Sequence, residues 1–464
     1  MNRLLLSVLS LLINIVIFAQ LPIGHTTITF NDPNRTGGFG SGGGPGRQIQ
    51  TEIYYPAVTA GIDVPVAQGE FPIISFGHGF AMAWSAYENI WEELVPLGYI
   101  IALPRTEGGL FPAPSHQDFG LDLSLVLDRL LDLNNDATTL FHDKLNGKSA
   151  LMGHSMGGGS SFLAANTNTN ATTLIGLAPA ETNPSAIAVA PNITIPTLVL
   201  SGQQDGVTPP NEHHIPMYDA SAADCKYFLS ILGGAHCYFA NSNFNCDFGE
   251  ATSSSGISIT RAEQQQTMYD AITPWLDFYL KGDCQAKTVF DDFLENDPRI
   301  APTFECNYQL PVSPTITLVG TDLVSSSAHT YQWFLNGQPI AGANDQQITL
   351  TDLGEYTVVI TDEFGCAAES DPYNHEGFAS VNEMDFESHL KLAPNPATNS
   401  FNIIGLLPNV NYQIVLMDNL GREVMSENID ENTGAIAINA LKTGVYFVKV
   451  FGNDGMSVTH RLVK

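Results

Sequence analysis

Basic residues are scarce in this sequence. Of its 464 residues only 18 are Lys or Arg, against 48 Asp and Glu, so the formal net charge at pH 7 is −30. Nucleic acids and anionic membranes bind basic surfaces, because their phosphate groups must be neutralised. The composition therefore argues against both as partners and is typical of a solvated extracellular surface.

No segment after the first twenty residues is long and apolar enough to span a bilayer. At the start of the chain, Arg3 precedes an apolar stretch from 4 to 18, and Ala19 follows it. This is the pattern of a signal peptide, and no cysteine follows the stretch to carry a lipid anchor. We expect residues 1–19 to be an export signal and the rest of the chain to be secreted or attached to the cell surface.

Cysteine is limited to six residues, and no C-x-x-C pair occurs among them. Metal binding is therefore not expected, and nothing else in the sequence implies a cofactor. Disulfides persist in exported proteins, because the compartments they reach are oxidising. The sequence leaves their connectivity open. Cys284 with Cys306 and Cys237 with Cys246 would each close a short loop, and we expect these two pairs.

The length indicates two to four folding units. In the first 308 residues, short apolar strands alternate with amphipathic helices, and the segments 71–76, 196–200 and 226–232 are examples of the strands. This alternation predicts an α/β domain over residues 20–308, in which helices cover a largely parallel sheet.

After Cys306 the pattern changes to alternating strands separated by turns. Trp333 lies in the middle of a predicted strand, and residues 352–356 resemble the tyrosine corner of immunoglobulin-like sandwiches. We expect residues 309–378 to form an immunoglobulin-like β-sandwich, which either binds a sugar or polymer or serves as a spacer. The polar residues 379–390 are expected to be a linker.

Residues 391–464 are expected to form a small C-terminal β-sandwich. They begin with Leu392-Ala-Pro-Asn-Pro-Ala397, continue with the apolar strand Gly444–Val450 and end with a basic segment. These motifs resemble the C-terminal sorting domain of type IX secretion cargo in Bacteroidetes. The resemblance implies that the type IX machinery carries the protein across the outer membrane, and that it is then released or attached to the cell surface.

The run Gly153-His-Ser-Met-Gly157 matches the G-x-S-x-G pattern of a nucleophile elbow. In that turn a serine between a strand and a helix has a strained backbone, and only glycine fits two positions before and after it. The turn presents the hydroxyl and points helix N–H groups at developing negative charge. The apolar strand before the run and the small residues after it predict Ser155 to be the nucleophile of an α/β-hydrolase fold.

The partners of such a serine follow it in the order acid, then histidine. Asp205 comes directly after the predicted strand 196–200, where this fold places the acid. His236 follows the predicted strand 226–232 and a Gly-Gly-Ala segment. We expect His236 to accept the proton of Ser155 and return it to the leaving group, with Asp205 fixing its tautomer.

Other histidines fit the role of the base less well. His213 and His214 come too soon after the acid, and His78 precedes the serine. His154 lies within the elbow, where we expect it to shape the wall of the substrate pocket. The loop after residue 76 contains Gly-His-Gly-Phe80, so we expect the backbone N–H groups of Phe80 and Met156 to form the oxyanion hole.

Together these segments resemble the cutinase-like polyesterase family, which includes the bacterial hydrolases of poly(ethylene terephthalate) and has dienelactone hydrolases and chlorophyllase-type esterases as neighbours. The resemblance covers most of residues 45–285 and rests on the order and spacing of the motifs. It implies an open cleft without a lid, an acyl-enzyme intermediate and carboxylic esters as substrates. It also implies that Phe80 and Met156 flank the acyl group, with His154 beside the serine.

Two positions depart from that family. His154 stands where polyester hydrolases often have Trp, and residues 181–183 (Glu-Thr-Asn) replace a clamp tryptophan. Lipids, aliphatic polyesters and acylated polysaccharides therefore stay open as substrates beside aromatic polyesters.

Two other function classes were weighed. A peptidase with this triad would usually carry a larger lid or propeller domain, and a non-enzymatic adhesin on a hydrolase fold would have a broken triad. Ser155, Asp205 and His236 are all present in order, which favours a secreted, monomeric serine carboxylester hydrolase without a cofactor.

Overall fold

The structure is a computed structural model that describes residues 20–376, 390–406, 410–430, 433–452 and 457–464. The predicted signal peptide, 1–19, and nearly all of the predicted linker, 379–390, lie outside these residues. The chain divides into two compact units, of which the first comprises Met1–Ser313 and two short later segments, Ser327–Tyr331 and Ile360–Glu369.

The first unit is built on an 11-stranded mixed sheet in the order β11-β10-β9-β8-β7-β5-β6-β3-β1-β4, with β2 beside β3. Its strands are β1 (Ile23–Asp32), β2 (Gly38–Phe39), β3 (Arg47–Pro56), β4 (Gly61–Ile62), β5 (Phe71–Gly77), β6 (Ile100–Pro104), β7 (Leu145–His154), β8 (Thr173–Leu177), β9 (Thr197–Gly202), β10 (Cys225–Ile231) and β11 (Ile300–Cys306). The strands from β6 to β10 run parallel, and the prediction of an α/β domain with a largely parallel centre is confirmed.

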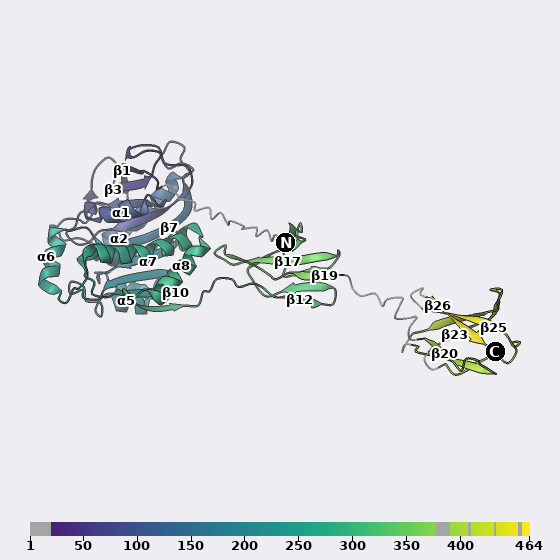
Figure 1. Ribbon diagram of the computed structural model, residues 1–464. Helices are drawn as coiled ribbons and strands as arrows, with labels where there is room; N and C mark the ends of the chain where they lie inside the picture. Colours follow the sequence, from purple (N-terminus) through teal and green to yellow (C-terminus); the bar gives the residue numbers. More distant parts are fainter. Residues whose placement is uncertain (1–19, 377–389, 407–409, 431–432, 453–456) are drawn as a thin grey trace, which may run out of the picture. The chain divides into compact units, whose positions relative to one another are not determined.

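Helices lie on the two faces of this sheet (Figure 1). They are α1 (Glu88–Leu94), α2 (His116–Leu133), α3 (Met156–Ala165), α4 (Ala186–Val189), α5 (His214–Ala220), α6 (Phe244–Ser253), α7 (Arg261–Lys281) and α8 (Cys284–Asn296), with short 3-10 turns η1 (Trp84–Tyr87), η2 (Ala190–Asn192) and η3 (Cys237–Phe239).

The alternation of side chains along the buried strands divides the core between the two faces. In β9, Leu198 and Leu200 pack with α1, α7 and α8, while Val199 between them packs with α2, α3 and α5. Because helices cover both faces of the sheet, every residue of β9 is buried. The carboxyl ends of these parallel strands are left to form a site.

Helix boundaries in this unit follow the capping residues. Ser115 accepts a hydrogen bond from the N–H of Asp118 at the start of α2. Thr260 and Glu263 form a capping box before α7, and Gly282 ends that helix with a left-handed φ of 68°.

Three disulfides cross-link the described chain, and they correct one of the two expected pairs. Cys237–Cys246 is present as expected. The expected pair Cys284–Cys306 is wrong, because Cys306 bonds Cys225 and Cys284 bonds Cys366. Cys225 and Cys306 lie directly opposite each other on the antiparallel strands β10 and β11, so strand pairing brings together residues that are 81 positions apart.

The remaining strands form four small sheets, in the orders β12-β13-β16, β15-β14-β17-β18 with β19 beside β17, β20-β21-β24 and β23-β22-β25-β26. Their bounds are β12 (Ile316–Val319), β13 (Asp322–Ser325), β14 (Thr330–Leu335), β15 (Gln338–Pro339), β16 (Gln347–Thr349), β17 (Gly354–Thr361), β18 (Ala367–Glu369), β19 (Tyr373–His375), β20 (Lys391–Ala393), β21 (Ser400–Ile404), β22 (Tyr412–Met417), β23 (Glu423–Ile429), β24 (Ile436–Ala437), β25 (Val445–Phe451) and β26 (Ser457–Val463).

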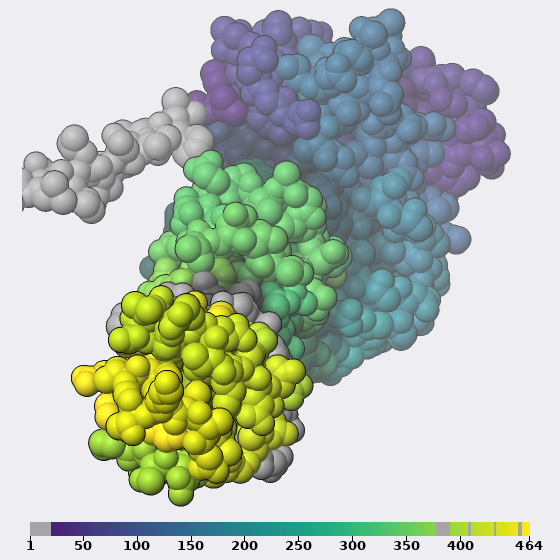
Figure 2. All heavy atoms as spheres, turned by 90° about the vertical axis from the view of Figure 1, so that its right-hand side faces the viewer, coloured from purple at the N-terminus to yellow at the C-terminus, as the bar shows by residue number. Residues whose placement is uncertain are grey.

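The strands from β20 onward enclose a core of their own. Phe401, Ile414, Val448 and Leu462 are fully buried in it. These residues belong to the segment drawn in yellow-green to yellow (Figure 2). No helix among the described residues combines enough length and apolar character to cross a bilayer.

Candidate active site

Ser155 lies in the turn between β7 and α3. Its backbone has φ 56° and ψ −122°, a region that L-residues with a Cβ rarely adopt. A Cβ on Gly153 would lie 2.4 Å from the carbonyl oxygen of Gly157, and one on Gly157 would lie 2.1 Å from that of Gly77. Both glycines of the motif are thus required by close backbone approach, as the sequence predicts.

Asp205 and His236 meet at the same end of the sheet, after β9 and β10. The imidazole Nδ1 of His236 lies 2.7 Å from Oδ2 of Asp205. The other carboxylate oxygen, Oδ1, accepts the backbone N–H groups of Val207 at 2.9 Å and Thr208 at 2.8 Å. Burial alone would raise the pKa of Asp205, but the charge and hydrogen bond of His236, together with the nearby His214 and the N–H of Thr208, lower it overall.

The second nitrogen of His236 is available for chemistry. Its Nε2 is buried and makes no hydrogen bond to any residue that the structure describes. The His236 ring lies against the elbow, since its centroid is 4.7 Å from the ring centroid of His154. The backbone oxygen of His236 also lies 3.0 Å from Nε2 of His154. The structure therefore brings His236 next to the residue that precedes Ser155.

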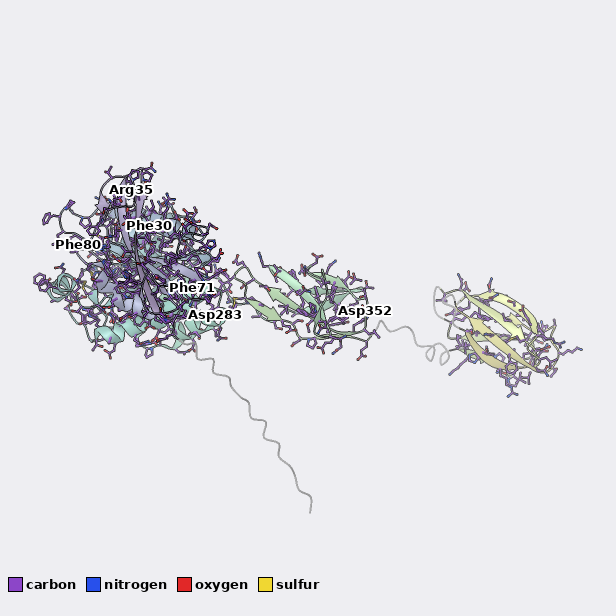
Figure 3. All side chains as sticks on the ribbon, turned by 90° about the horizontal axis from the view of Figure 1, so that it is seen from above. Phe30, Arg35, Phe71, Phe80, Asp283 and Asp352 are labelled. Atoms are coloured by element: carbon purple, nitrogen blue, oxygen red, sulfur yellow. A yellow bond between two sulfur atoms is a disulfide. The ribbon has the colours of Figure 1, made fainter. Side chains whose placement is uncertain are left out.

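The expected oxyanion donors are Met156, within the elbow, and Phe80, in the loop after β5. Met156 is the first residue of α3, so its N–H has no acceptor within the helix. The residue Met156 is 2% exposed, so the group that it presents to a ligand is chiefly its backbone N–H. Phe80 belongs to the loop after β5, which pairs with β7 so that Gly77 is opposite Gly153. The Phe80 side chain stands at the outer edge of the domain (Figure 3).

His154, the residue before the serine, is enclosed in the protein interior. Its side chain is 0% exposed, with Nδ1 2.8 Å from Oη of Tyr87 and Nε2 bonded to the backbone of His236. Burial, and then the nearby His236, lower its pKa well below the usual value. Its ring is therefore enclosed between Tyr87 and His236, and a role in shaping the wall of the substrate pocket stays a prediction.

Two of the histidines set aside as bases, His78 and His213, are bonded to the backbone. Both ring nitrogens of His78 face backbone oxygens, those of Gly79 at 3.0 Å and Thr106 at 2.9 Å. Nδ1 of His213 accepts the backbone N–H of Glu181 at 2.9 Å.

Two residues near the acid were missed from the sequence. The hydroxyl of Thr208 lies 3.0 Å from Oδ2 of Asp205 and 2.8 Å from Nδ1 of His236. His214 follows, with Nε2 3.0 Å from the same hydroxyl. A threonine three residues after an aspartate is typical of a side-chain-capped turn, which is the signal that points to Thr208. Nothing local points to His214.

Exposed aromatic side chains border the candidate site. Phe244 and Phe248 on α6 are 83% and 64% exposed and stack with their ring centroids 6.3 Å apart, and Phe80 is 51% exposed. The side-chain amide of Asn245 donates to the backbone oxygen of Ala81 at 2.8 Å, which joins α6 to the Phe80 loop. We call Phe80, Phe244 and Phe248 the aromatic rim.

The start of α6 is also tied to the histidine loop. Cys246 is bonded to Cys237, the residue after His236. The carboxylate of Glu250 accepts the N–H of Cys237 at 2.6 Å. Within the described residues, no group of three or more His, Cys, Asp or Glu side chains is arranged to hold a metal ion.

Comparison with known proteins identifies two parts of the chain. Residues 22–270 match the family model described as PET hydrolase-like, and residues 391–464 match that of the secretion system C-terminal sorting domain. Both matches confirm the resemblances that the motifs carry. The sorting-domain match marks the protein as secreted or attached to the cell surface.

Characterised relatives align with the first of these parts. Cutinase est1 of Thermobifida alba is 26% identical over 216 residues, which are 46% of this chain and 64% of that protein. Bis(hydroxyethyl) terephthalate hydrolase of Streptomyces coelicolor is 27% identical over 186 residues, 40% of this chain and 54% of that protein. The chain thus spans less than two thirds of the length of these relatives.

Proposed function

Because this chain belongs to the PET hydrolase-like family, we propose that it is a secreted serine carboxylester hydrolase of the cutinase type that acts on polyesters. Ser155, His236 and Asp205 form its triad. The observation that carries this proposal is the 2.7 Å contact between Asp205 and Nδ1 of His236, which leaves the buried Nε2 beside the elbow without a hydrogen-bond partner among the described residues.

The reaction proceeds in two halves. The Ser155 oxygen attacks the ester carbonyl carbon while Nε2 of His236 takes its proton, and Asp205 stabilises the imidazolium that forms. The N–H groups of Met156 and Phe80 hold the oxyanion. The carbon–oxygen bond to the alcohol then breaks, and the alcohol leaves with the proton from His236. Water attacks the acyl-enzyme in the same way and releases the carboxylic acid and free Ser155.

A polymeric ester is the substrate that the surface supports best. Isolated exposed aromatics are common, but the rim places three beside one candidate site. A flat, partly apolar polymer surface can cover these rings while one ester group enters the site. Lipids and acylated polysaccharides share the same chemistry at the carbonyl and are separated by the substrate panel below.

The proposal extends to the whole chain. Residues 20–308 form the catalytic domain, 309–378 an immunoglobulin-like domain, and 391–464 the type IX sorting domain that engages the secretion machinery, with 379–390 between them. The protein works as a monomer. For the middle domain, support comes from the fully buried Trp333 on β14 and from Tyr356, whose hydroxyl donates to the backbone oxygen of Asp352 at 3.0 Å.

Hydrolysis of p-nitrophenyl butyrate by the purified protein, compared with Ser155→Ala, tests the triad. We expect the variant to lose activity by at least about 1000-fold and to lose labelling by a fluorophosphonate. Ser160→Ala is the matched control, because Ser160 is also buried in this segment, one turn into α3. An inactive and unlabelled wild type would show that the proposal is wrong.

A panel of short acyl esters, triglyceride, acetylated xylan and amorphous polyester film tests the substrate. Release of soluble acid from the film at a rate comparable to that from short esters is expected. Turnover of triglyceride or xylan without film hydrolysis would refute the polyester assignment. It would not contradict the proposed triad.

A further inference from the structure

Hydrogen bonds continue from the acid of the triad into the protein through Thr208, whose hydroxyl also lies 2.8 Å from Nδ1 of His236. The Thr208 hydroxyl contacts Oδ2 of Asp205 at 3.0 Å, and Nε2 of His214 contacts that hydroxyl at 3.0 Å. This series of hydrogen bonds ends at Ser201, whose hydroxyl lies 2.8 Å from Nδ1 of His214. All four side chains are buried, and none of these contacts takes part in the mechanism described above.

One arrangement of protons satisfies the contacts from Asp205 through Thr208 and His214 to Ser201, with the N–H at Nδ1 of His236 shared between Oδ2 of Asp205 and the Thr208 oxygen. The ionised carboxylate of Asp205 only accepts, so the Thr208 hydroxyl donates its single proton to it. His214 must then donate from Nε2 to the Thr208 oxygen, and its Nδ1 accepts from Ser201. The reverse order would set the lone pairs of the Thr208 oxygen against the carboxylate at 3.0 Å. Burial lowers the pKa of His214 to about 3, in keeping with the neutral imidazole that this order needs.

The carboxylate of Asp205 is consequently saturated. Oδ1 accepts two backbone N–H groups, and Oδ2 accepts the imidazole of His236 and the hydroxyl of Thr208. Four donors match the acceptor capacity of a carboxylate. It cannot rotate without losing a buried hydrogen bond, and its charge is shared between Thr208 and the catalytic imidazole.

We propose that Thr208 and His214 are positioning residues of the esterase site, which hold Asp205 in the orientation and charge state that His236 needs. This inference rests on the proposed function. Thr208 acts directly on the carboxylate, and His214 fixes the direction of the Thr208 hydroxyl. Their effect belongs to the step in which the imidazolium forms, so it falls on kcat and not on substrate binding.

Thr208→Val tests the proposal, because it removes the hydroxyl and keeps the shape of the side chain. We expect kcat on p-nitrophenyl butyrate to fall about tenfold with KM unchanged, the size expected for one hydrogen bond to a charged group. The fall in kcat comes from the lost orientation of the carboxylate, whereas its charge, no longer shared with Thr208, holds the proton of the resting imidazolium more tightly. The acid limb of the kcat/KM profile then moves to higher pH, by about half a pH unit or more.

Other titratable and charged groups also face the triad and are unchanged in this variant. They are His154, against the ring of His236, His213 and His214 at the start of α5, and Glu250 and Arg261, both bonded to the backbone of Cys237. A shift of the acid limb in Thr208→Val therefore reports on the hydroxyl.

Three further variants make the experiment specific. Thr208→Ser restores a hydroxyl and is expected to restore kcat and the pH midpoint. His214→Phe keeps a ring but removes the donor, and is expected to shift the midpoint in the same direction as Thr208→Val. The control is Thr267→Val, since Thr267 is also buried but donates to the backbone oxygen of Glu263 within α7, and no change is expected.

The outcomes separate the two proposals. An active wild type with a Thr208→Val variant of unchanged kcat and unchanged pH midpoint overturns the positioning role and leaves the esterase intact. A lower kcat with an unshifted midpoint and a lower melting temperature also overturns it, because that is the signature of structural damage alone. A wild type that hydrolyses no ester overturns both proposals.

Discussion

Removal of the two outermost aromatic rings of the rim should separate hydrolysis of a polymer from hydrolysis of a small ester. The perturbation is the double variant Phe244→Ala/Phe248→Ala. Both side chains point largely into solvent, so the substitution leaves no cavity and the fold should be retained. The substitutions do not change the proposed triad, and kcat/KM on p-nitrophenyl butyrate should change by less than about twofold.

The size of the effect on the film follows from exposure. A phenylalanine ring contributes roughly 200 Å² of surface, and with 83% and 64% exposed the pair presents about 300 Å². A film that covers about half of it would gain roughly 4 kcal/mol at ~25 cal/mol per Å². Ordering and desolvation reduce this to about 1–2 kcal/mol, or about 5- to 30-fold in adsorption.

The assay measures enzyme bound to the film and acid released, both at limiting enzyme concentration. Phe304→Ala is the control, because Phe304 is 51% exposed but lies on the edge strand β11. The control should hydrolyse the film like the wild type. Film hydrolysis by the double variant at the wild-type rate would refute the view that the rim contacts polymer, and equal losses on film and small ester would point to damage at the site.

Two further predictions concern stability. Replacing Cys237 and Cys246 by Ser opens a loop of 9 positions, and the loop-closure relation puts the loss at about 2.5 kcal/mol of unfolding free energy, measurable by chemical denaturation; an unchanged midpoint would contradict it. Because burial lowers the pKa of His214 to about 3, the unfolded chain binds a proton below about pH 6.5 that the folded chain does not. Stability should therefore fall as the pH falls from about 6.5 to about 3, by up to ~1.4 kcal/mol per unit from this group. Denaturation curves at pH 7, 5 and 4 should show a shallower fall in His214→Phe, and parallel falls would rule this source out.

The features that a short stretch of sequence determines were predictable. The elbow needs a serine between two glycines, and the structure shows the backbone contacts that demand them. Asp205 and His236 were found because parallel strands of this fold end at one edge of the sheet. The same argument could not find His214, because its contact with Thr208, six positions earlier, depends on where α5 begins.

The errors have a common cause. The pairing of Cys284 with Cys306 followed closeness in sequence, whereas Cys306 is placed by the register of β10 and β11. His154 was expected to shape the wall of the substrate pocket, and its complete burial was not foreseen. The orientation of its ring depends on a hydrogen bond between Nδ1 and the hydroxyl of Tyr87, which lies 67 positions away in the sequence. Long-range packing of this kind leaves no local pattern.

The bond between Cys284 and Cys366 makes a covalent ring of the chain between them. A single proteolytic cut inside this ring leaves both pieces joined until the disulfide is reduced. A protease that frees the hydrolase from its sorting sequence must therefore cut after Cys366. Any mature enzyme produced by one cut then retains most of residues 309–378. These residues stay attached to the hydrolase after the sorting domain is removed.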